Sequence, residues 1–593
     1  MGAGIPASEP LRIEGPEQGV VNVDLPDGAL PPAIGVHNFQ VFRATRGRPE
    51  LADGKGYTYN HHVDMGCWKG LLYVGWNSCE KDEDTWPSRE LYSTSPDGAH
   101  WSDPAELFPQ GVSMPLRMYF FHAPNRRMLA IAGLRVTRGL IGEKLKGPLV
   151  VREIRSDHTL GEFFTLRPSA QATAESPPPL YTEAKENGFV EACNQLLANR
   201  PFLEQQDYGL LLDDRRMKWH DAGNWPDRKL PHEGHEFWVF GKGMSFFHRK
   251  DGALVGIAKR GWVTVSTDEG ETWSQPAVPS TFVVGSAKTW PQRTSDGRYA
   301  LVFNPDKHKR LPLVIVTGQD GVTFRDMRVV QGEVPIMRYE GGKGTGPQYV
   351  RGISEWSGDG SWKDQAMWIV YSMNKEDVWV GRIPVPVRAA ASVTPVGDFD
   401  ATPAGPIVPG WNVYSPKWAP VSVVRLPGGG SKCLRLEDRD PYDYARAVCV
   451  FPQARKLAVS FEVMVRRANR GTLGIELLGE SSRIRPVRVA LTDDNKLEAV
   501  NGGQTVELPS HSADRWLAVK IEANAVAGKF SLSVDGKCLL KDAAFADGAD
   551  SLHQVSFRTG EYRQIGGVKA VQPETDCPVE PAIYDIRNVR ITP

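Results

Sequence analysis

A short pattern of serine, aspartate, glycine and an aromatic residue recurs along the chain and restricts its fold more than any other feature. Its best copy is Ser266-Thr-Asp-Glu-Gly-Glu-Thr-Trp273, and degenerate copies occupy residues 95–101 and 317–324. The aspartate suits a turn because its carboxylate accepts hydrogen bonds from backbone N–H groups, and the glycine adopts a positive φ without strain. We therefore expect a repeated turn between strands, with the aromatic residue packed between neighbouring sheets.

Each copy closes a unit of strand, turn, strand, gap and strand. The units repeat every ~40 to 50 residues, which is the length of a four-stranded propeller blade. Six units are recognisable, including one around Cys193-Asn194-Gln195, and an early strand at residues 35–44 would complete the last blade. The sequence therefore predicts an all-β fold in which residues 1–392 form a six- or seven-bladed β-propeller.

The pattern changes beyond a linker that is rich in proline and small residues. Residues 456–467, 516–524 and 582–593 alternate apolar and polar side chains without the turn pattern, which is typical of a β-sandwich. We expect residues 393–593 to form this linker and a concanavalin-like or laminin-G-like jelly-roll sandwich. Two of the thirteen histidines, His511 and His553, lie there. The chemistry is therefore expected in the propeller, and the sandwich is expected to be separable from it.

The charge balance limits the possible partners of the chain. Its 593 residues include 70 Lys and Arg against 71 Asp and Glu, a net charge of -1. Such a chain has no overall field to attract nucleic acid or an anionic membrane, so neither is expected as a partner. The seven cysteines lack C-x-x-C spacing, which argues against a zinc knuckle or a disulfide framework. Oligomeric state is left open by the sequence.

The blade repeat also predicts which side chains meet at the central channel. The first strand of a blade is innermost, so residues at its start converge from different blades on one pocket. Applied to the units, this rule selects a basic and aromatic ring: His61, His62, Arg117, Asn194 with Gln195, Lys242, Lys288 with Trp290, and Gln348 with Tyr349. Because adjacent strand residues point to opposite sides, one histidine is expected to face the pocket and the other the blade packing.

Two further segments attract attention but have simpler interpretations. His232-Glu-Gly-His235-Glu236 lacks the i, i+4 spacing of a helical zinc site, so a solvated loop is favoured over a metal site. The run Asn374-Lys-Glu-Asp377 is expected to form a surface turn. No cofactor is certain, although a structural divalent ion, calcium or zinc, is left open.

The turn pattern is the Asp box of sialidase-like (BNR) β-propellers, and longer strings narrow the resemblance. Residues 59–65 (YNHHVDM), 287–305, 346–353 and 370–387 resemble the group of L-rhamnose-α-1,4-D-glucuronate lyases and α-L-rhamnosidases that act on gum-arabic side chains. The resemblance covers roughly residues 30–390. It implies polysaccharide degradation by a secreted or periplasmic bacterial protein whose signal peptide is absent from this sequence, with a cytoplasmic location as the alternative. The F-R-I-P-type start of true sialidases is not found, so sialic acid is disfavoured.

Members of this group are understood to use histidine, which points to His61 or His62, and Arg293, Tyr349 and Arg351 lie in the other shared strings. Elimination across a 4-linked uronate needs a base, an acid and cations that stabilise the carboxylate. His61, His62, Arg293 and Tyr349 are the predicted catalytic residues. The predicted substrate-binding residues are Arg117, Asn194, Lys242, Lys288, Trp290 and Arg351.

The preferred function is a polysaccharide lyase that cleaves a uronate- or rhamnose-containing polysaccharide by β-elimination. A hydrolase would be expected to present two carboxylates, and the ring contains none. A histidine-dependent glycoside hydrolase such as an α-L-rhamnosidase is the alternative. A non-catalytic glycan-binding propeller is the second alternative.

Overall fold

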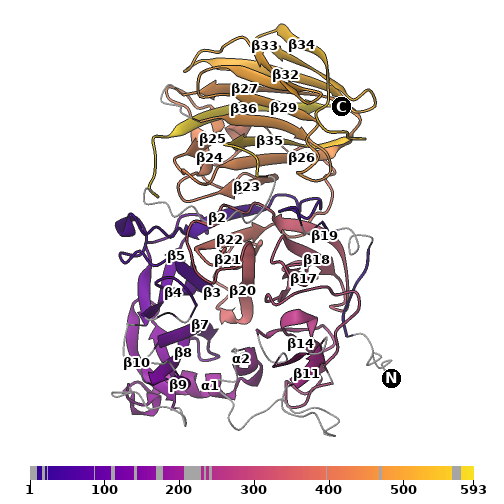
Figure 1. The fold of residues 1–593 in the computed structure, drawn as a ribbon. Helices are drawn as coiled ribbons and strands as arrows, with labels where there is room; N and C mark the ends of the chain where they lie inside the picture. Colours follow the sequence, from indigo (N-terminus) through magenta and orange to yellow (C-terminus); the bar gives the residue numbers. More distant parts are fainter. Residues whose placement is uncertain are drawn as a thin grey trace.

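The computed structural model describes residues 10–15, 21–22, 24–83, 85, 87–108, 114–138, 143–168, 178–205, 229–232, 235–238, 243–274, 276–395, 397–466, 471–563 and 576–593. Within these ranges, the side chains of residues 114–117, 134–138, 143–147, 204, 229–232 and 235–238 are not described. The fold is almost entirely β, with a propeller followed by a sandwich, as the sequence predicts (Figure 1). No helix among the described residues is long and apolar enough to span a membrane.

Five blade-type sheets make up the described part of the propeller. The first is β3 (Tyr59–Trp68), β4 (Leu71–Cys79), β5 (Ser88–Ser95) and β6 (Ala105–Phe108); the second is β7 (Met114–His122), β8 (Met128–Arg138), β9 (Glu143–Ile154) and β10 (Leu160–Arg167). The third is β13 (Ser245–His248), β14 (Leu254–Ile257) and β15 (Val263–Ser266), which follows a separate hairpin of β11 (Lys229–His232) and β12 (His235–Trp238). The fourth is β16 (Trp290–Arg293), β17 (Tyr299–Phe303), β18 (Leu313–Gly318) and β19 (Thr323–Gln331), extended by β1 (Arg12–Ile13). The fifth is β20 (Pro347–Gly358), β21 (Met367–Met373) and β22 (Asp377–Ile383), closed by β2 (His37–Phe42).

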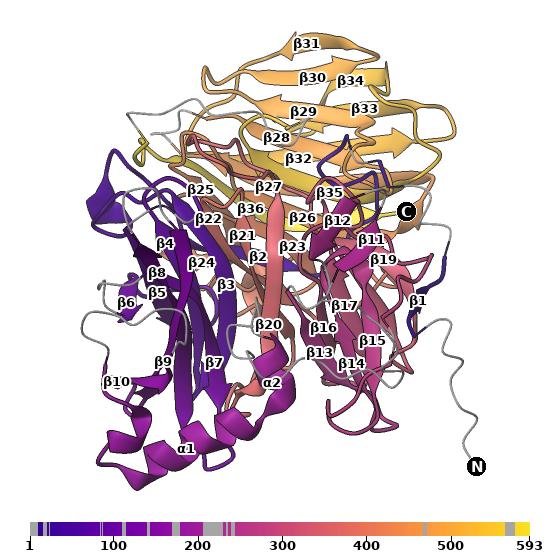
Figure 2. The ribbon, with the colours of Figure 1, turned by 60° about the horizontal axis from the view of Figure 1, so that its bottom comes forward.

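One expected blade unit is a helix instead. The segment around Cys193 forms α1 (Asn187–Ala198), and α2 (Arg200–Gln205) follows. Phe189, Ala192, Cys193 and Leu196 are buried, and their i, i+3, i+4, i+7 spacing places them on one helical face. Both helices lie at the end of the propeller away from the sandwich (Figure 2). The described residues hold five blade sheets, and the expected total of six or seven stays a prediction.

The Asp boxes form the predicted turns. In the best copy, Asp268 accepts a hydrogen bond from the backbone N–H of Thr272 at 2.8 Å, and Gly270 has a φ of 83°. Trp273 is fully buried and donates its indole N–H to the Gly270 carbonyl. The copies at residues 95–101 and 317–324 repeat the aspartate caps, and each connects the third and fourth strands of its blade.

The sandwich consists of two facing sheets around one large apolar core. One sheet has β24 (Val421–Arg425), β25 (Lys432–Asp438), β36 (Ala582–Thr592), β27 (Lys456–Val465), β32 (Trp516–Asn524), β33 (Lys529–Val534) and β34 (Lys537–Ala544) in that order. The other has β31 (Gln504–Leu508), β30 (Leu497–Asn501), β29 (Val487–Leu491), β28 (Leu473–Leu478), β35 (Leu552–Thr559), β26 (Arg446–Ala454) and β23 (Trp411–Ser415). Short 3-10 turns occur at η2 (Pro49–Leu51), η3 (Tyr181–Glu183), η5 (Lys259–Gly261) and η6 (Phe399–Ala401).

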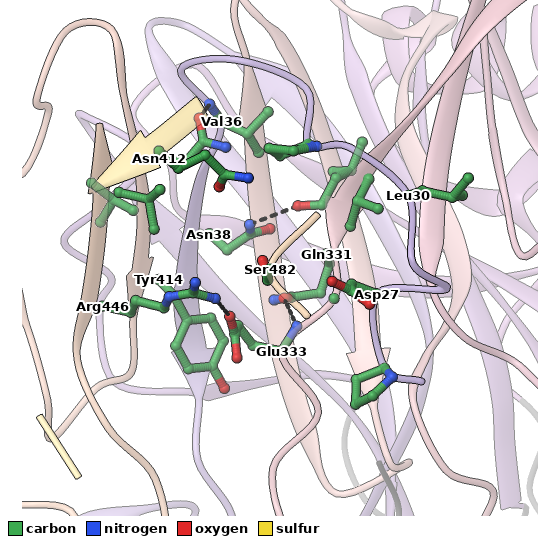
Figure 3. Close-up of a pocket in the computed structure, with 18 of the residues that line it drawn as sticks. Asp27, Leu30, Val36, Asn38, Gln331, Glu333, Asn412, Tyr414, Arg446 and Ser482 are labelled. Carbon is green, nitrogen blue, oxygen red and sulfur yellow. Dashed lines mark hydrogen bonds and ion pairs between the residues drawn. The ribbon is translucent and has the colours of Figure 1, made fainter. Parts of the chain in front are cut away.

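Propeller and sandwich share a continuous hydrogen-bonded sheet. Strand β2 pairs antiparallel with β22 of the propeller and parallel with β23 of the sandwich, so one ladder of fifteen strands crosses the boundary. A small cavity of about 80 Å³ lies at the same junction, where Glu333 of the propeller and Arg446 of the sandwich form an ion pair (Figure 3). This shared sheet argues against the expectation that the sandwich is a separable module.

Candidate active site

Two β-bulges place the aromatic groups of the site. One interrupts β3 between His61 and Asp64, and the other interrupts β20 between Gln348 and Arg351. Each contains a residue in the left-handed region, His62 at φ 55° and Tyr349 at φ 57°. Such a conformation costs a non-glycine residue about 1–3 kcal/mol, and strain of this kind clusters at functional sites.

The bulges overturn the expected alternation of the histidine pair. The His61 ring lies 4.1 Å from the Tyr349 ring, the His62 ring 5.3 Å from it, and the two imidazoles 4.6 Å from each other. The prediction that one imidazole turns into blade packing is therefore wrong, because the extra residue of the bulge brings both rings to Tyr349.

Cations from three loops surround Tyr349. Lys259 Nζ donates to the phenol oxygen at 2.6 Å and also lies 4.3 Å from the ring centroid. Lys288 Nζ and the Arg310 guanidinium carbon lie 5.3 and 5.0 Å from that centroid. Burial alone would raise the pKa of Tyr349, but the charges of Lys259 and Arg310 outweigh it and lower the pKa below its usual value. The phenol is therefore easier to ionise than that of an ordinary buried tyrosine.

His61 is fully buried beneath this phenol. Its Nδ1 lies 2.6 Å from Ser372 Oγ, and its Nε2 has no hydrogen-bond partner among the described residues. Burial and then the charges of His62 and Lys375 hold the pKa of His61 well below its usual value. A neutral imidazole in this position can pack against Tyr349 and orient its ring.

His62 contacts a carboxylate that was not among the predicted site residues. Its Nε2 lies 3.1 Å from Glu83 Oε1, and Lys375 Nζ lies 3.4 Å from Glu83 Oε2. The Glu83 side chain is 34% exposed, so this pair connects the buried rings with solvent. Glu83 lies in the loop that follows β4, so a rule that selects only the starts of strands could not find it. The run of acidic residues after Cys79 was the one sequence feature that could have pointed to a carboxylate here.

A second carboxylate, Asp64, is buried near the charges of Lys288 and Arg351. It follows the bulge of β3, is buried, and accepts a hydrogen bond from the backbone N–H of Phe120 at 2.9 Å. Burial raises the pKa of Asp64 to about 7, even though Arg351 and Lys288 oppose the shift. The ring inferred from the blade starts lacks carboxylates, but the loop residue Glu83 adds one beside His62.

A basic cleft of about 750 Å³ adjoins the cluster. Its lining includes Ser286, His308, Lys309, Arg310, Lys343 and Lys375, with Asp24 as the acidic residue among the described ones. Lys309 is paired with Asp24 at 2.8 Å. Arg310 also contacts Tyr349, and Lys375 also contacts Glu83, so the cleft and the cluster form one site.

The segment Asn374–Asp377 is buried, contrary to the predicted surface turn. Asn374 and Lys375 both have a φ of 57°, and the side chains of Glu376 and Asp377 bond to Arg338 and its neighbours rather than to solvent. The charged composition suggested exposure, but the carboxylates have buried arginine and lysine partners.

The structure brings together some predicted site residues and separates others. His61, His62, Tyr349 and Lys288 converge. Arg351 and Trp290 are buried deeper; Arg351 Nη1 donates to the Met244 carbonyl at 2.9 Å, and Trp290 belongs to the core between blades.

Arg293 is exposed at the end of β16, where the charge of Arg293 acts on Glu355. Asn194 is exposed on α1 and accepts a hydrogen bond from the Tyr181 hydroxyl, because its segment is helical.

The remaining predictions fall outside what the structure describes. Arg117 lies on β7, but its side chain is not among those described, and Lys242 lies outside the described residues. His232 and His235 pair across the β11–β12 hairpin, and their side chains are likewise outside. The described residues contain no cluster of three or more histidine, cysteine, aspartate or glutamate side chains suited to a metal ion.

Family models match both parts of the chain. Residues 11–209 match the BT_1020-like N-terminal β-propeller, and residues 411–577 match the CBM domain of sialidase-like proteins. No curated protein sequence matches the chain. The resemblance to the rhamnose-glucuronate lyase and rhamnosidase group therefore stays a prediction.

One solved structure supports the same architecture. It is titled "Sialidase" and is 29% identical with a TM-score of 0.85, and the match covers 98% of this chain and 54% of that one. The chain thus spans about half the length of this relative. A Trypanosoma rangeli sialidase mutant with trans-sialidase activity is 12% identical (TM-score 0.36, 95% and 96% covered). A Bacillus halodurans xylan β-1,4-xylosidase is 11% identical (TM-score 0.32, 97% and 100% covered), and these two superpose too poorly to support an argument. The chain is therefore similar in both parts to sialidase-like proteins, with a β-propeller followed by a domain that resembles their CBM domain.

Proposed function

We propose that this chain cleaves a glycosidic bond at a carboxylate-bearing sugar, with Tyr349 as the reacting group. The observation that carries the proposal is the Tyr349 hydroxyl, held 2.6 Å from Lys259 Nζ while Lys288 and Arg310 lie over the ring. Cations gathered in a buried pocket attract an anionic ligand. Arginine suits a carboxylate because two of its N–H groups can donate to the two carboxylate oxygens at once. The adjoining basic cleft extends this preference to an oligosaccharide.

Hydrolysis is the chemistry we favour. Tyrosine is the nucleophile of sialidases, an exception to the usual carboxylate pair, and a relative titled "Sialidase" aligns with nearly the whole chain. In the first step the Tyr349 phenolate oxygen bonds to the anomeric carbon as the glycosidic C–O bond breaks. Glu83, supported by His62, donates a proton to the leaving oxygen. Water then attacks the same carbon, gives its proton to Glu83, and releases the Tyr349 oxygen.

β-Elimination is the second candidate, favoured by the lowered pKa of Tyr349. Here the phenolate removes the C5 proton of a uronate, the electrons form the C4–C5 double bond, and the 4-linked oxygen leaves with a proton from the Glu83 carboxyl. Lys259, Lys288 and Arg310 would stabilise the charge on the carboxylate. Hydrolysis ranks first because Glu83 supplies the carboxylate whose absence had favoured elimination.

The test is a screen of uronate- and rhamnose-containing oligosaccharides that follows reducing ends and ultraviolet absorbance together. Hydrolysis releases a reducing end without new absorbance, whereas elimination also creates a conjugated, absorbing uronate. Tyr349→Phe should lower either rate by about a hundredfold or more, since it removes the reacting oxygen. A Tyr349→Phe variant as fast as the parent would contradict the proposal. If the parent binds the oligosaccharides without cleaving them, the chain is a non-catalytic glycan-binding propeller instead.

The charge of the substrate is tested separately with a carboxyl-reduced analogue. If the cations bind a carboxylate, the neutral analogue should be cleaved far more slowly, and cleavage of the acidic substrate should weaken with salt. Equal cleavage of the two substrates would rule out both an acidic substrate and elimination, because elimination needs the carboxylate to acidify the C5 proton.

A further inference from the structure

We propose that Asp576, a residue of the C-terminal domain, is a positioning residue for the propeller site and acts through the turn at residues 374–377. The inference rests on the proposed function in one respect, because its activity readout is cleavage of an acidic glycan. It assigns the sandwich a part in catalysis that is distinct from binding glycan.

The turn is joined directly to the site. The backbone carbonyl of Lys375 accepts a hydrogen bond from the N–H of Asn60 at 2.7 Å, and that of Glu376 accepts one from Asn60 Nδ2 at 2.9 Å. Asn60 immediately precedes His61, and the Lys375 ammonium lies 3.4 Å from the Glu83 carboxylate that contacts His62. A displacement of this turn would therefore move both the strand that carries the histidines and the cation beside Glu83.

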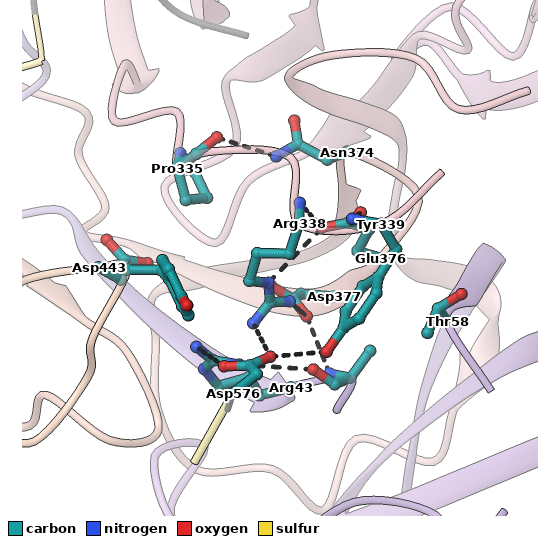
Figure 4. A network of polar contacts seen from close by, with 12 residues as sticks. Arg43, Thr58, Pro335, Arg338, Tyr339, Asn374, Glu376, Asp377, Asp443 and Asp576 are labelled. Atoms are coloured by element: carbon teal, nitrogen blue, oxygen red, sulfur yellow. Dashed lines mark hydrogen bonds and ion pairs between the residues drawn. The ribbon is translucent and has the colours of Figure 1, made fainter. Parts of the chain in front are cut away.

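Arg338 holds the turn from the other side. Its backbone N–H donates to Glu376 at 3.0 Å, and its guanidinium donates to Asp377 (Figure 4). The N–H of Tyr339 donates to the same Glu376 carboxylate at 2.7 Å. Lys343, which lines the basic cleft, lies 3.4 Å from Glu376. One short segment, residues 338–343, thus contacts both carboxylates of the turn, and the Ala44 N–H also donates to Asp377 at 2.9 Å.

Asp576 anchors this segment to the sandwich. Its carboxylate accepts hydrogen bonds from the Tyr339 hydroxyl at 2.7 Å and from Arg43 at 2.9 Å, and it lies 3.6 Å from Arg338 Nη1. All of these charged groups are buried (Figure 4). Asp576 is an acceptor shared by Arg43, Arg338 and Tyr339. Its loss leaves Arg338 with the two turn carboxylates Asp377 and Glu376 as its remaining partners, so Arg338 and the turn should shift together.

The chain offers a matched control in Asp585. This aspartate is also fully buried in the C-terminal segment and pairs with two arginines, Arg435 and Arg466. Its partners belong to the sandwich and do not reach the propeller turn. Asp585→Asn should therefore destabilise the sandwich as Asp576→Asn does, without moving the site.

The experiment compares Asp576→Asn and Asp585→Asn in the full chain by thermal unfolding, by kcat/KM on an acidic oligosaccharide, and by hydrogen exchange across residues 370–383. Both variants should lower Tm. Asp576→Asn alone should lower kcat/KM by about tenfold to a hundredfold, as expected when reacting groups are misplaced, and should speed exchange in the turn. If Asp576→Asn does not fold, Tyr339→Phe removes one hydrogen bond to Asp576 and should give a smaller change in the same direction.

Two outcomes would overturn the inference. One is an equal loss of kcat/KM in the two aspartate variants, which would indicate a general effect of stability. The other is unchanged exchange across the turn in Asp576→Asn or Tyr339→Phe. If the parent chain cleaves no acidic glycan, the proposed function fails by itself, and the exchange comparison still decides whether Asp576 positions the turn.

Discussion

Tyr349 is subject to two opposing influences, since burial disfavours its phenolate and the neighbouring cations favour it. Lys259 is the closest of these cations, so Lys259→Met should raise the pKa of Tyr349. In the proposed reaction the phenolate is the reactive form, so activity should rise with pH through this pKa. The rising limb of the kcat/KM profile should therefore shift to higher pH. Lys520→Met, an exposed sandwich lysine, is the control; an unshifted limb in Lys259→Met would contradict the assignment.

The two histidines should respond differently to substitution. His62→Ala should lower turnover by about a hundredfold or more, because it removes the partner of Glu83, the proposed acid–base group. His61→Ala removes a buried ring that packs on Tyr349, so it should lower Tm as well as activity. Steady-state kinetics and thermal unfolding of both variants provide the comparison. Small and equal effects on turnover would show that neither imidazole takes part in the reaction.

Only part of the site could be predicted from residues alone. His61, His62, Lys288 and Tyr349 could be found because they lie near the starts of inner strands, where the blade repeat fixes position. Lys259, Arg310 and Glu83 lie in turns and loops outside those starts. No local pattern says how a loop folds back over a neighbouring blade, so these residues required the structure.

At the scale of elements, β2 carries a titratable group at the junction of the two domains. His37 donates from Nδ1 to the Gly35 carbonyl and accepts the N–H of Val408 at Nε2, so its neutral form is held in place. Burial, aided by the charge of Arg382, lowers the pKa of His37 to about 3. The unfolded chain binds this proton below the ordinary histidine pKa of about 6.5, whereas the folded chain binds it only near pH 3. The free energy of unfolding should therefore decrease as the pH falls from about 6.5 to about 3. His37 alone should contribute a loss of about 1.4 kcal/mol per pH unit in this range.

Denaturant unfolding of the parent and of His37→Gln between neutral and acidic pH tests this linkage. The variant is expected to be less stable near neutrality but to lose less stability on acidification. Parallel pH profiles for the two proteins would exclude His37 as the origin of the acid sensitivity.

Elements differed in how far the sequence specified them. The Asp-box turns were predictable because aspartate, glycine and the aromatic residue each satisfy a local requirement. Helix α1 was missed because its apolar residues were interpreted as part of a strand, although their spacing is helical. The bulges at His62 and Tyr349 have no local signature, and they depend on the pairing of strands that are far apart in sequence.

For the whole molecule, removal of the sandwich should destroy the propeller site. A chain ending at residue 392 would leave β2 without β23, and Arg43 and Arg338 without Asp440 and Asp576. A buried arginine that loses its carboxylate partner strongly destabilises the folded state. We therefore expect this shorter chain to be insoluble or inactive, as judged by circular dichroism and glycan cleavage. A folded and active shorter chain would restore the view of the sandwich as an accessory module.

The position of β2 has a consequence for synthesis of the protein. The backbone N–H of Ala44, just beyond β2, bonds to the Asp377 carboxylate, which lies 333 residues later in the chain. At translation rates of ~5 to 20 residues per second, β2 waits roughly 20 to 70 seconds on the ribosome before its propeller partner β22 exists, and longer for β23. Over that time its apolar edge is open to pairing with other chains. The nascent protein should therefore depend on chaperones, and its yield should improve when translation at low temperature keeps the concentration of unfinished chains small.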